Sequence, residues 1–255
     1  MSKLHYILPM GGAGTRFFNN GITVPKPLIE LNGKPFFYWA AQSVLKFYDV
    51  SDMTCVILLE HAQKYSLDKE IKKYFPDAKI VYLDHVLNGA VLTCLEGVKG
   101  IEDDGPVLFN DCDHAFYIKG EDRTFIAEKN DDDGAIVTFE SDNPAFSYVE
   151  LDDNGNVCRT VEKEVVSNQA ICGAYYFKNR TIFENMADEY FDKCQYKEFF
   201  VSGVYNVMAQ HSLKIKSYPL DLHITFGTPD EYYLAENRSD EFKLFLPDSC
   251  NNTSV

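Results

Sequence analysis

The chain has 255 residues, of which 45% are hydrophobic and 25% are charged, the composition of an ordinary globular protein. This composition excludes a fully disordered chain, a collagen-like chain and a disulfide scaffold. Twenty-four basic residues against thirty-nine acidic ones give a net charge of −15. Such a surface repels nucleic acid and anionic lipid, so we expect no nucleic acid and no membrane partner.

The seven cysteines indicate a reducing compartment. Their number is odd and no two have C-x-x-C spacing, which favours free thiols over disulfides or a zinc site. The first apolar run, at residues 4–10, is too short for a signal peptide and has no basic segment before it. No apolar stretch approaches the length of a membrane span. We therefore expect a cytoplasmic protein.

The first half of the chain alternates β-rich runs with helical patterns, which is typical of βαβ units and a mostly parallel sheet. Pro35 suits the first turn of a helix, and Ser66 is a good N-cap residue. Strands are predicted at residues 4–8, 54–59, 79–83 and 106–109, and helices at residues 35–48, 66–75 and 90–98.

The second half of the chain is rich in β-like segments. Strands are predicted at residues 134–140, 147–151, 157–162, 170–177 and 214–218, and helices at residues 180–193, 198–210 and 229–236. Residues 153–156, Asp-Asn-Gly-Asn, predict a hairpin turn. Since there is no repeat and no linker, we expect one α/β domain over residues 1–246 and a loose tail at residues 247–255. Its sheet should be mixed and mostly parallel, with a β-rich insertion on the C-terminal side.

A glycine-rich loop at residues 11–14 follows the first predicted strand and leads into Thr15 and Arg16. It matches neither the dinucleotide pattern G-x-G-x-x-G nor the P-loop. Such a loop brings backbone N–H groups close to an anion, and Arg16 adds a planar cation. Taken alone, the loop fits a tight strand-to-helix turn equally well, because glycine serves turns as readily as ligands.

A second cation, Lys26, lies between Pro25 and Pro27. The two prolines restrict the backbone, so the lysine side chain is held in a fixed direction. A rigid surface turn with an incidental lysine is the alternative. Two cations near a glycine loop in a strongly acidic chain favour a phosphate site.

The run from Gly11 to Phe17, followed by Pro25-Lys26-Pro27-Leu28, resembles the signature of the nucleoside-triphosphate transferase superfamily. Its best-known members are the sugar-1-phosphate nucleotidylyltransferases and their cytidylyltransferase relatives. Weaker similarity extends to about Pro229, so the resemblance covers nearly the whole chain. It implies a single-domain, Rossmann-like nucleotide-diphospho-sugar transferase fold. It also implies Mg²⁺ as cofactor and transfer from a nucleoside triphosphate to a phosphate monoester, with release of pyrophosphate.

Two aspartates, Asp111 and Asp113, follow the predicted strand at residues 106–109. Ligands of open α/β sheets bind at the carboxyl ends of strands, and carboxylates suit Mg²⁺. The pair resembles the family's metal-binding acidic loop, with Asp113 preferred. Aspartates that cap the following segment are the alternative. We expect no catalytic base at His114, because a phosphate monoester is mostly dianionic at neutral pH.

The resemblance assigns the remaining site residues. Arg16, Lys26 and Lys163 are the expected catalytic residues, with Lys163 on the acceptor phosphate. The nucleotide is expected on Gly11, Gly12, Ala13, Gly14, Thr15, Asn88 and Gly89, and the acceptor on Glu162, Gly173 and Glu198. Considered singly, these positions also fit a helix cap, a solvated charge cluster, an edge-strand glycine and a helix-starting acid.

One position departs from the family pattern. Many relatives have an aspartate two residues before the Gly-Thr-Pro near the end, but this chain has Thr225 there. Asp221, four residues earlier, is a candidate replacement. The departure puts the two-aspartate metal site in doubt.

The function expected from these observations is nucleotidyl transfer to a sugar phosphate, giving a nucleotide-activated sugar for surface polysaccharide. A cytidylyltransferase acting on a non-sugar phosphate such as phosphocholine is the alternative within the class, and an aromatic cage would favour it. A glycosyltransferase of the related fold does not need the Arg16 and Lys26 elements. A degenerate nucleotide-binding regulator would fit Thr225. The nucleobase, the acceptor and a homo-oligomeric state stay open.

Overall fold

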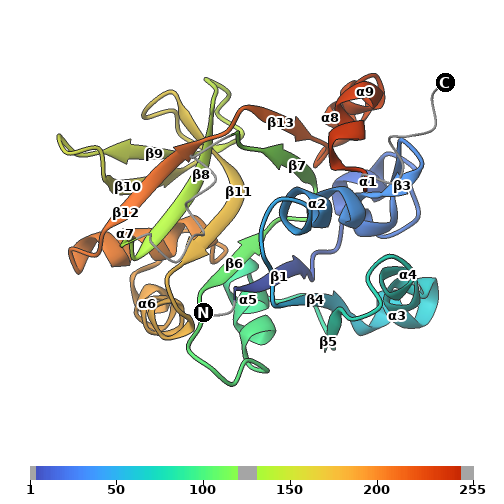
Figure 1. The fold of residues 1–255 in the computed structure, drawn as a ribbon, viewed down its shortest axis with the longest axis horizontal. Coiled ribbons are helices and arrows are strands. Elements are labelled where there is room, and N and C mark those ends of the chain that lie inside the picture. Colours follow the sequence, from blue (N-terminus) through green and yellow to red (C-terminus); the bar gives the residue numbers. More distant parts are fainter. Residues whose placement is uncertain (1–3, 120–130, 248–255) are drawn as a thin grey trace.

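The computed structural model describes residues 4–119 and 131–247 (Figure 1). The strands are β1 (His5–Met10), β2 (Glu30–Leu31), β3 (Lys34–Pro35), β4 (Asp52–Leu58), β5 (Lys79–Leu83), β6 (Val107–Asn110), β7 (His114–Tyr117), β8 (Gly134–Glu140), β9 (Ser147–Leu151), β10 (Val157–Glu162), β11 (Gln169–Phe177), β12 (Ile215–Pro219) and β13 (Leu222–Thr225). The helices are α1 (Thr15–Asn19), α2 (Phe36–Leu45), α3 (Leu59–Tyr65), α4 (Leu67–Tyr74), α5 (Ala90–Val98), α6 (Arg180–Lys193), α7 (Val201–Gln210), α8 (Pro229–Glu236) and α9 (Ser239–Phe242), with the 3-10 turns η1 (Lys26–Leu28) and η3 (Lys243–Phe245).

The parallel part of the large sheet is built around β1. β1 pairs in parallel with β4 and β6, and β5 continues the parallel part beyond β4. On the other side of β6 the sheet becomes largely antiparallel through β11, β8, β9 and β10, and β12 joins β8 in parallel. Figure 1 shows this second part on the left and β1, β4 and β5 on the right. The mixed α/β fold with a β-rich second half is therefore confirmed.

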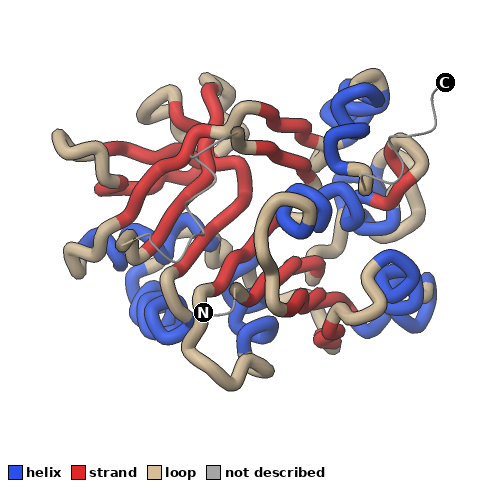
Figure 2. The backbone as a smooth tube through the Cα atoms, viewed as in Figure 1, coloured by secondary structure: helices blue, strands red, loops and turns tan. Residues whose placement is uncertain are grey.

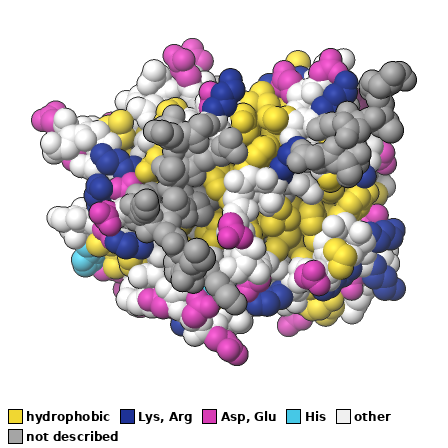
Figure 3. Space-filling model, viewed as in Figure 1, with side chains coloured by type: hydrophobic (Ala, Val, Ile, Leu, Met, Phe, Trp, Pro, Cys, Tyr) yellow, Lys and Arg dark blue, Asp and Glu magenta, His cyan; other side chains and the backbone are white. Residues whose placement is uncertain are grey.

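Two hydrophobic cores lie on the two faces of this sheet, because successive residues of a strand point to opposite faces. In β1, Tyr6 and Leu8 belong to one core and Ile7 belongs to the other. Helices α2, α4 and α8 contribute to the first core, and α5, α6 and α7 to the second (helices are blue in Figure 2). On the face in Figure 3, hydrophobic side chains gather toward the middle and charged ones lie mainly around the edge.

Several predicted boundaries are wrong for local reasons. Pro35 precedes α2 in an extended conformation and pairs within β3, so the helix begins at the next residue and ends at Leu45. Ser66 stands before α4, but its φ is +56° and its side chain makes no capping hydrogen bond. Helix α7 begins at Val201, three residues later than predicted. The hairpin turn between β9 and β10 is confirmed, with Gly155 at φ +72°.

Several elements have no counterpart in the predicted set, among them α3, β7 and β13. Helix α3 follows β4 directly and has seven residues, too few for a clear helical period. Strands β7 and β13 pair antiparallel with each other outside the large sheet. Each has four residues, and neither is recognisable without its partner, which lies far away in the sequence.

Six cysteines lie in the described part of the chain and all six are free thiols, as expected. Four of these, at positions 55, 94, 112 and 172, are buried. The seventh, Cys250, and residues 248–255 of the expected tail lie outside the described residues.

Candidate active site

A cleft of about 770 Å³ opens at the carboxyl ends of β1 and β6. Because these strands are parallel neighbours, the segments that follow them meet at one edge of the sheet. The cleft brings together most of the predicted site residues. It is lined by residues 9–17, Lys26, Pro27, residues 86–90, Thr93, residues 111–113, Glu198, Phe200 and Gly227.

The glycine loop forms one wall of the cleft. Gly14 has φ +64°, and a Cβ placed on it would lie 3.3 Å from the Lys26 Cβ, so a glycine lets η1 pack against the loop. At Gly11 a Cβ would lie 2.7 Å from Leu83. Gly12 has nothing within 4 Å of its Cβ position, so its outer side faces open space. The loop therefore serves both as a tight turn and as an open surface toward the cleft.

The two predicted cations differ in their surroundings. The Lys26 Nζ lies 2.7 Å from the Asp113 Oδ2, and each of the two side chains is 26% exposed. The guanidinium of Arg16 is exposed and has no ion-pair or hydrogen-bond partner within residues 4–119 and 131–247. One cation is thus paired with a predicted metal ligand, and the other is available to an anion.

The two aspartates influence each other strongly. Burial, together with the neighbouring charge of Asp113, raises the pKa of Asp111 to about 7 against the opposing charge of Lys26. Burial would also raise the pKa of Asp113, but Lys26 outweighs burial and holds it below its usual range. The pKa of Lys26, which burial alone would lower, lies above its usual range because of Asp113.

The donor set at these aspartates fits a magnesium ion that arrives with phosphates. No group of three or more His, Cys, Asp or Glu side chains in the described part of the chain is arranged to hold a metal ion. Mg²⁺ needs only one or two carboxylates when substrate phosphates and water supply its other ligands. Two adjacent carboxylates therefore suit such an ion, and they do not form an all-protein metal site.

Asp113 is held in place by the C-terminal part of the chain. Its carbonyl oxygen accepts a hydrogen bond from the Phe226 amide at 3.0 Å. A Cβ on Gly227 would lie 2.6 Å from the Asp113 Oδ2, so only glycine fits there. Thr228 and Glu231 form a capping box that begins α8 directly after this contact. Sequence reasoning used the Gly-Thr-Pro only as a family signal and missed its contact with Asp113.

The candidate replacement ligand, Asp221, lies at the wrong end of β13. Thr225 pairs with His114 beside Asp113, whereas Asp221 precedes Leu222, which pairs with Tyr117. Four residues of strand separate Asp221 from Thr225, about 13 Å. Asp221 instead accepts a hydrogen bond from the Lys119 amide. We conclude that this chain has no second aspartate at the family position.

His114 is buried beside the acidic loop, with 2% of its surface exposed. Burial lowers its pKa to about 4, so the ring is uncharged at neutral pH. Its ring stacks on Phe116 and meets His223 edge to face. A Cβ on Gly173 would lie 2.8 Å from Asp111 and 3.2 Å from His114. Gly173, predicted on the acceptor, is therefore packed against these two side chains.

Glu162 and Lys163, which were expected on the acceptor, are not among the residues that line the cleft. Glu162 accepts a hydrogen bond from the Ser202 hydroxyl at the start of α7. Lys163 has φ +56°, a strained conformation for lysine, and its amide donates to the Phe146 carbonyl. The Lys163 Nζ lies 5.6 Å from the ring centre of Phe200, which does line the cleft.

Asn88 and Gly89 line the cleft, as does Glu198. Gly89, and not Asn88, is the N-cap residue of α5, and no side chain caps this helix. The Gly89 amide donates to the Leu87 carbonyl, within its own segment. With a φ of +109°, Gly89 packs against the backbone of Phe199.

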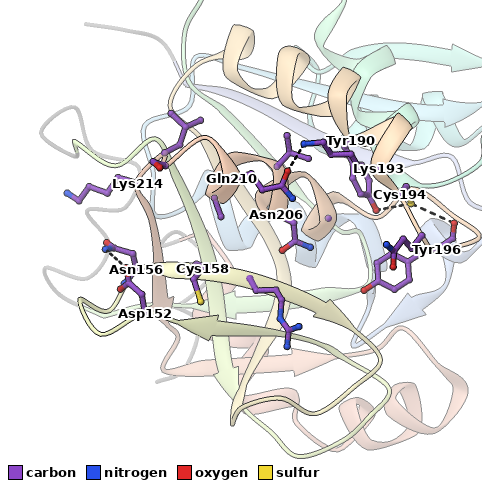
Figure 4. A pocket seen from close by; sticks show the side chains of 18 residues that line it. Asp152, Asn156, Cys158, Tyr190, Lys193, Cys194, Tyr196, Asn206, Gln210 and Lys214 are labelled. Atoms are coloured by element: carbon purple, nitrogen blue, oxygen red, sulfur yellow. Dashed lines mark hydrogen bonds between the residues drawn. The ribbon is translucent and has the colours of Figure 1, made fainter.

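A second cavity, of about 870 Å³, lies between the β9–β10 turn and helices α6 and α7 (Figure 4). It shares no lining residue with the cleft. Three of its lining residues are basic, and each already has an acidic partner: Arg159 with Glu150, Lys193 with Glu189 and Lys214 with Asp132. The cleft at the strand ends, where the Arg16 guanidinium is available to an anion, is therefore the stronger candidate for the functional site. Within the described ranges, no helix is long and apolar enough to cross a membrane.

Comparisons with known proteins agree with this geometry. The family described as Nucleotidyl transferase matches residues 6–238. A D-glycero-alpha-D-manno-heptose 1-phosphate guanylyltransferase of Campylobacter jejuni is 25% identical over 236 residues, which cover 89% of this chain and 96% of that protein. The bifunctional protein GlmU of Campylobacter concisus is 25% identical over 240 residues, which cover 90% of this chain but 51% of that protein. The chain thus spans about half the length of this relative.

Solved structures share the fold. A nucleoside-diphosphate-sugar pyrophosphorylase from Vibrio cholerae matches with a TM-score of 0.79 at 20% identity, covering 91% of this chain and 99% of that one. An inositol-1-phosphate CTP transferase from T. maritima matches with a TM-score of 0.74 at 13% identity, covering 94% and 97%. These likenesses extend over nearly the whole of each chain.

Proposed function

The chain belongs to the nucleotidyl transferase family, and from this premise we propose that it joins a nucleoside triphosphate to a sugar phosphate and releases pyrophosphate. The observation that carries the proposal is the meeting of the glycine loop, Arg16, Lys26 and the two aspartates in one cleft. A triphosphate needs several positive or N–H-bearing groups close together, and the chain as a whole repels it. The cleft offers such a set within a strongly acidic protein.

In the proposed reaction, an oxygen of the acceptor phosphate attacks the α-phosphorus of the nucleotide. The bond from that phosphorus to the oxygen bridging to the β-phosphorus breaks, and pyrophosphate leaves with the electron pair. The acceptor phosphate is mostly dianionic at neutral pH, so no protein base is required. The protein contributes positioning and charge stabilisation.

Each group in the cleft has a part in this proposal. Arg16 and Lys26 bind the triphosphate and neutralise the charge that develops on the leaving pyrophosphate. Asp111 and Asp113 would hold Mg²⁺, which would supply positive charge to stabilise the phosphates when bound. Lys163 directs the acceptor phosphate toward the α-phosphorus, while Glu162 and Glu198 contact the acceptor body.

A sugar phosphate is favoured over phosphocholine by the aromatic side chains. In the described lining of the cleft these are Phe17 and Phe200. Phe17 is buried against Phe36 and Tyr232, and a lysine already lies over the ring of Phe200. A quaternary ammonium needs open aromatic faces around it. The guanylyltransferase relative, whose name gives a sugar 1-phosphate as its substrate, supports the same choice.

The product of this reaction is a nucleotide-activated sugar, the donor type used in polysaccharide assembly. We propose that the protein makes this product in the cytoplasm and that the product serves the assembly of surface polysaccharide. Six free thiols, four of them buried, fit a reducing compartment.

The test is a matrix of CTP, GTP, UTP and dTTP against glucose 1-phosphate, heptose 1-phosphate and phosphocholine, with Mg²⁺ and a pyrophosphate readout. The Lys26→Met protein serves as the blank. We expect pyrophosphate only where one triphosphate meets one sugar 1-phosphate. Turnover with phosphocholine alone would mean that the acceptor is not a sugar phosphate. The absence of turnover with every pair of triphosphate and acceptor would contradict the proposed reaction.

A further inference from the structure

A backbone bridge joins the two walls of the cleft. The Phe199 amide donates to the Asn88 carbonyl at 3.2 Å, and the Val91 amide donates to the Phe199 carbonyl at 3.1 Å. Phe199, on the acceptor side, thus donates one backbone hydrogen bond and accepts another, as a residue of a short strand would, against the start of α5. The Phe199 carbonyl also satisfies an amide in the first turn of that helix, which has no side-chain cap.

Gly89 makes the bridge possible. Its φ of +109° is a conformation that residues with a side chain rarely adopt. A Cβ at this position would lie 2.3 Å from the Phe199 nitrogen and 2.5 Å from its oxygen. These are backbone atoms, which cannot turn aside as the end of a flexible side chain can. Any larger residue at position 89 must therefore push Phe199 away.

The segment on either side of Phe199 carries the acceptor side of the cleft. Glu198 and Phe200 both line it. The ring of Phe200 lies under the Lys163 ammonium, and Ser202, two residues further, holds Glu162. Three of the residues expected on the acceptor, Glu162, Lys163 and Glu198, therefore depend on the placement of this segment.

The other end of the segment is anchored as well. The Cys194 thiol donates to the Tyr190 hydroxyl at 3.2 Å and lies 3.7 Å from the carbonyl oxygens of Tyr196 and Glu198. A chain fixed at residue 194 and at α7 has few ways to move except at the bridge. The position of residues 88–91 then sets the position of Glu198 and Phe200.

We propose that Phe199 is a positioning residue whose backbone bridge to Asn88 and Val91 couples nucleotide binding to the geometry of the acceptor side. The inference rests on the proposed function, because it takes residues 86–90 as the nucleotide wall. A triphosphate that orders this wall also orders residues 198–200, and so raises the affinity for the acceptor. Such coupling is reciprocal and is typically about 5- to 150-fold in affinity. Gly89 then serves the bridge and is not a base-reading residue.

The test compares the full-length protein with Gly89→Ala. Calorimetry first identifies which of CTP, GTP, UTP and dTTP binds with Mg²⁺. Hydrogen exchange by mass spectrometry then follows the amides of residues 195–201 with and without that triphosphate. We expect the triphosphate to slow this exchange in the original protein but not in Gly89→Ala. In steady-state assays with glucose 1-phosphate and heptose 1-phosphate, the variant should show an acceptor KM raised about tenfold, with little change in the triphosphate affinity that calorimetry measures in the absence of acceptor.

Two further variants keep the test decisive. Gly100→Ala is the matched control, because a Cβ there meets nothing within 4 Å and it should behave as the original protein. Val91→Pro removes the amide that donates to Phe199 and adds no bulk at position 89, since proline is tolerated in a first helical turn. It should reproduce the loss of coupling even if Gly89→Ala does not fold.

The outcomes separate the two proposals. If none of the triphosphates binds the original protein, the proposed function fails, and the inference with it. If a triphosphate binds but leaves the exchange of residues 195–201 unchanged, the inference alone is wrong. A Gly89→Ala protein that weakens triphosphate binding in the absence of acceptor as much as it raises the acceptor KM would identify Gly89 as a direct nucleotide contact and would also overturn the bridge proposal.

Discussion

Lys26 and Asp113 are paired with each other at 2.7 Å, although one is expected on the triphosphate and the other on the metal. Without substrate, the ammonium of Lys26 balances the negative charge of Asp113. In the proposed function, a triphosphate would offer Lys26 a stronger partner, and Asp113 would then be available to Mg²⁺. The geometry therefore predicts that metal and nucleotide bind together.

Lys26→Met should abolish turnover and leave the fold intact. The lysine is partly exposed and contributes a charge to the cleft rather than packing to a core, so pyrophosphate release should fall by about 100- to 1000-fold. Lys34→Met is the control, because its ammonium lies over Tyr38 and Tyr74 outside the cleft. Pyrophosphate assays and thermal unfolding measure both. Near-normal turnover, or an unfolded Lys26→Met protein, would contradict the assignment.

Arg16→Lys should be poorly tolerated although it keeps the charge. The Arg16 guanidinium is free of protein partners in the described ranges, so its planar fork can bind two phosphate oxygens at once, which an ammonium cannot reproduce. For Arg16→Lys we expect the KM for the triphosphate to rise about tenfold. For Arg16→Ala we expect a kcat/KM below that of Arg16→Lys. Equal kinetics for lysine and arginine would mean that Arg16 acts only as a diffuse charge.

Metal binding should require nucleotide. Calorimetric titration of Mg²⁺ should give little heat with the free protein and clear binding with a non-hydrolysable triphosphate, because Lys26 occupies Asp113 in the free state. Asp113→Asn should remove most of the ternary binding, and Asp111→Asn less. Asp221→Asn is the control and should be near neutral, since Asp221 bonds to the Lys119 amide. Tight binding to the free protein, or a large effect at Asp221, would mean that a metal ligand is misplaced.

Stability should depend on pH through Asp52, at the opposite ends of the strands. Asp52 accepts hydrogen bonds from His5 at 2.9 Å and from Lys79 at 2.8 Å. Burial would raise the pKa of Asp52, but these two partners outweigh burial and lower it. A carboxylate whose folded-state pKa lies below its unfolded-state value adds to the free energy of unfolding above that unfolded value. The contribution disappears as the pH falls through the folded-state pKa.

Asp52→Asn should therefore cost about 1.5 kcal/mol in the free energy of unfolding at pH 7, because it weakens a hydrogen bond to the buried His5. Denaturant unfolding should show the difference from the original protein shrinking below about pH 4. Asp49→Asn, at an exposed position nearby, should show neither effect. A cost that stays constant from pH 7 to pH 3 would rule out the charge as its cause.

The fold was predictable wherever the pattern is local. The strand–helix alternation of the first half, the hairpin turn at Gly155 and helix α5 all follow from periodicity and turn residues. Strands β7 and β13 were not predictable, because each is stabilised by pairing with the other, which local patterns do not reveal. The start of α7 was not predictable for the same reason, since the backbone of Phe199, just before this helix, is hydrogen-bonded to Asn88 and Val91.

In the site, residue types were predictable and their partners were not. The glycine loop and Lys26 lie close enough together in the sequence to be recognised as one motif. The pairing of Lys26 with Asp113 and the packing of Gly227 on that same carboxylate are tertiary contacts. Gly89 was expected on the nucleotide and lines the cleft, but its contact with the backbone of Phe199 is another tertiary contact that local patterns do not reveal.

The anchoring of Asp113 by Phe226 and Gly227 has a consequence for synthesis on the ribosome. Asp113 lies before the middle of the chain, and the segment that holds it leaves the ribosome more than a hundred residues later. At about 10 residues per second, the acidic loop waits roughly ten seconds for its anchor. During that interval the nascent chain already contains Arg16, Lys26 and both aspartates but lacks the contacts that hold Asp113. If the proposed function holds, an interrupted chain that ends before β13 would lack the contacts that hold Asp113, and we expect it to be inactive.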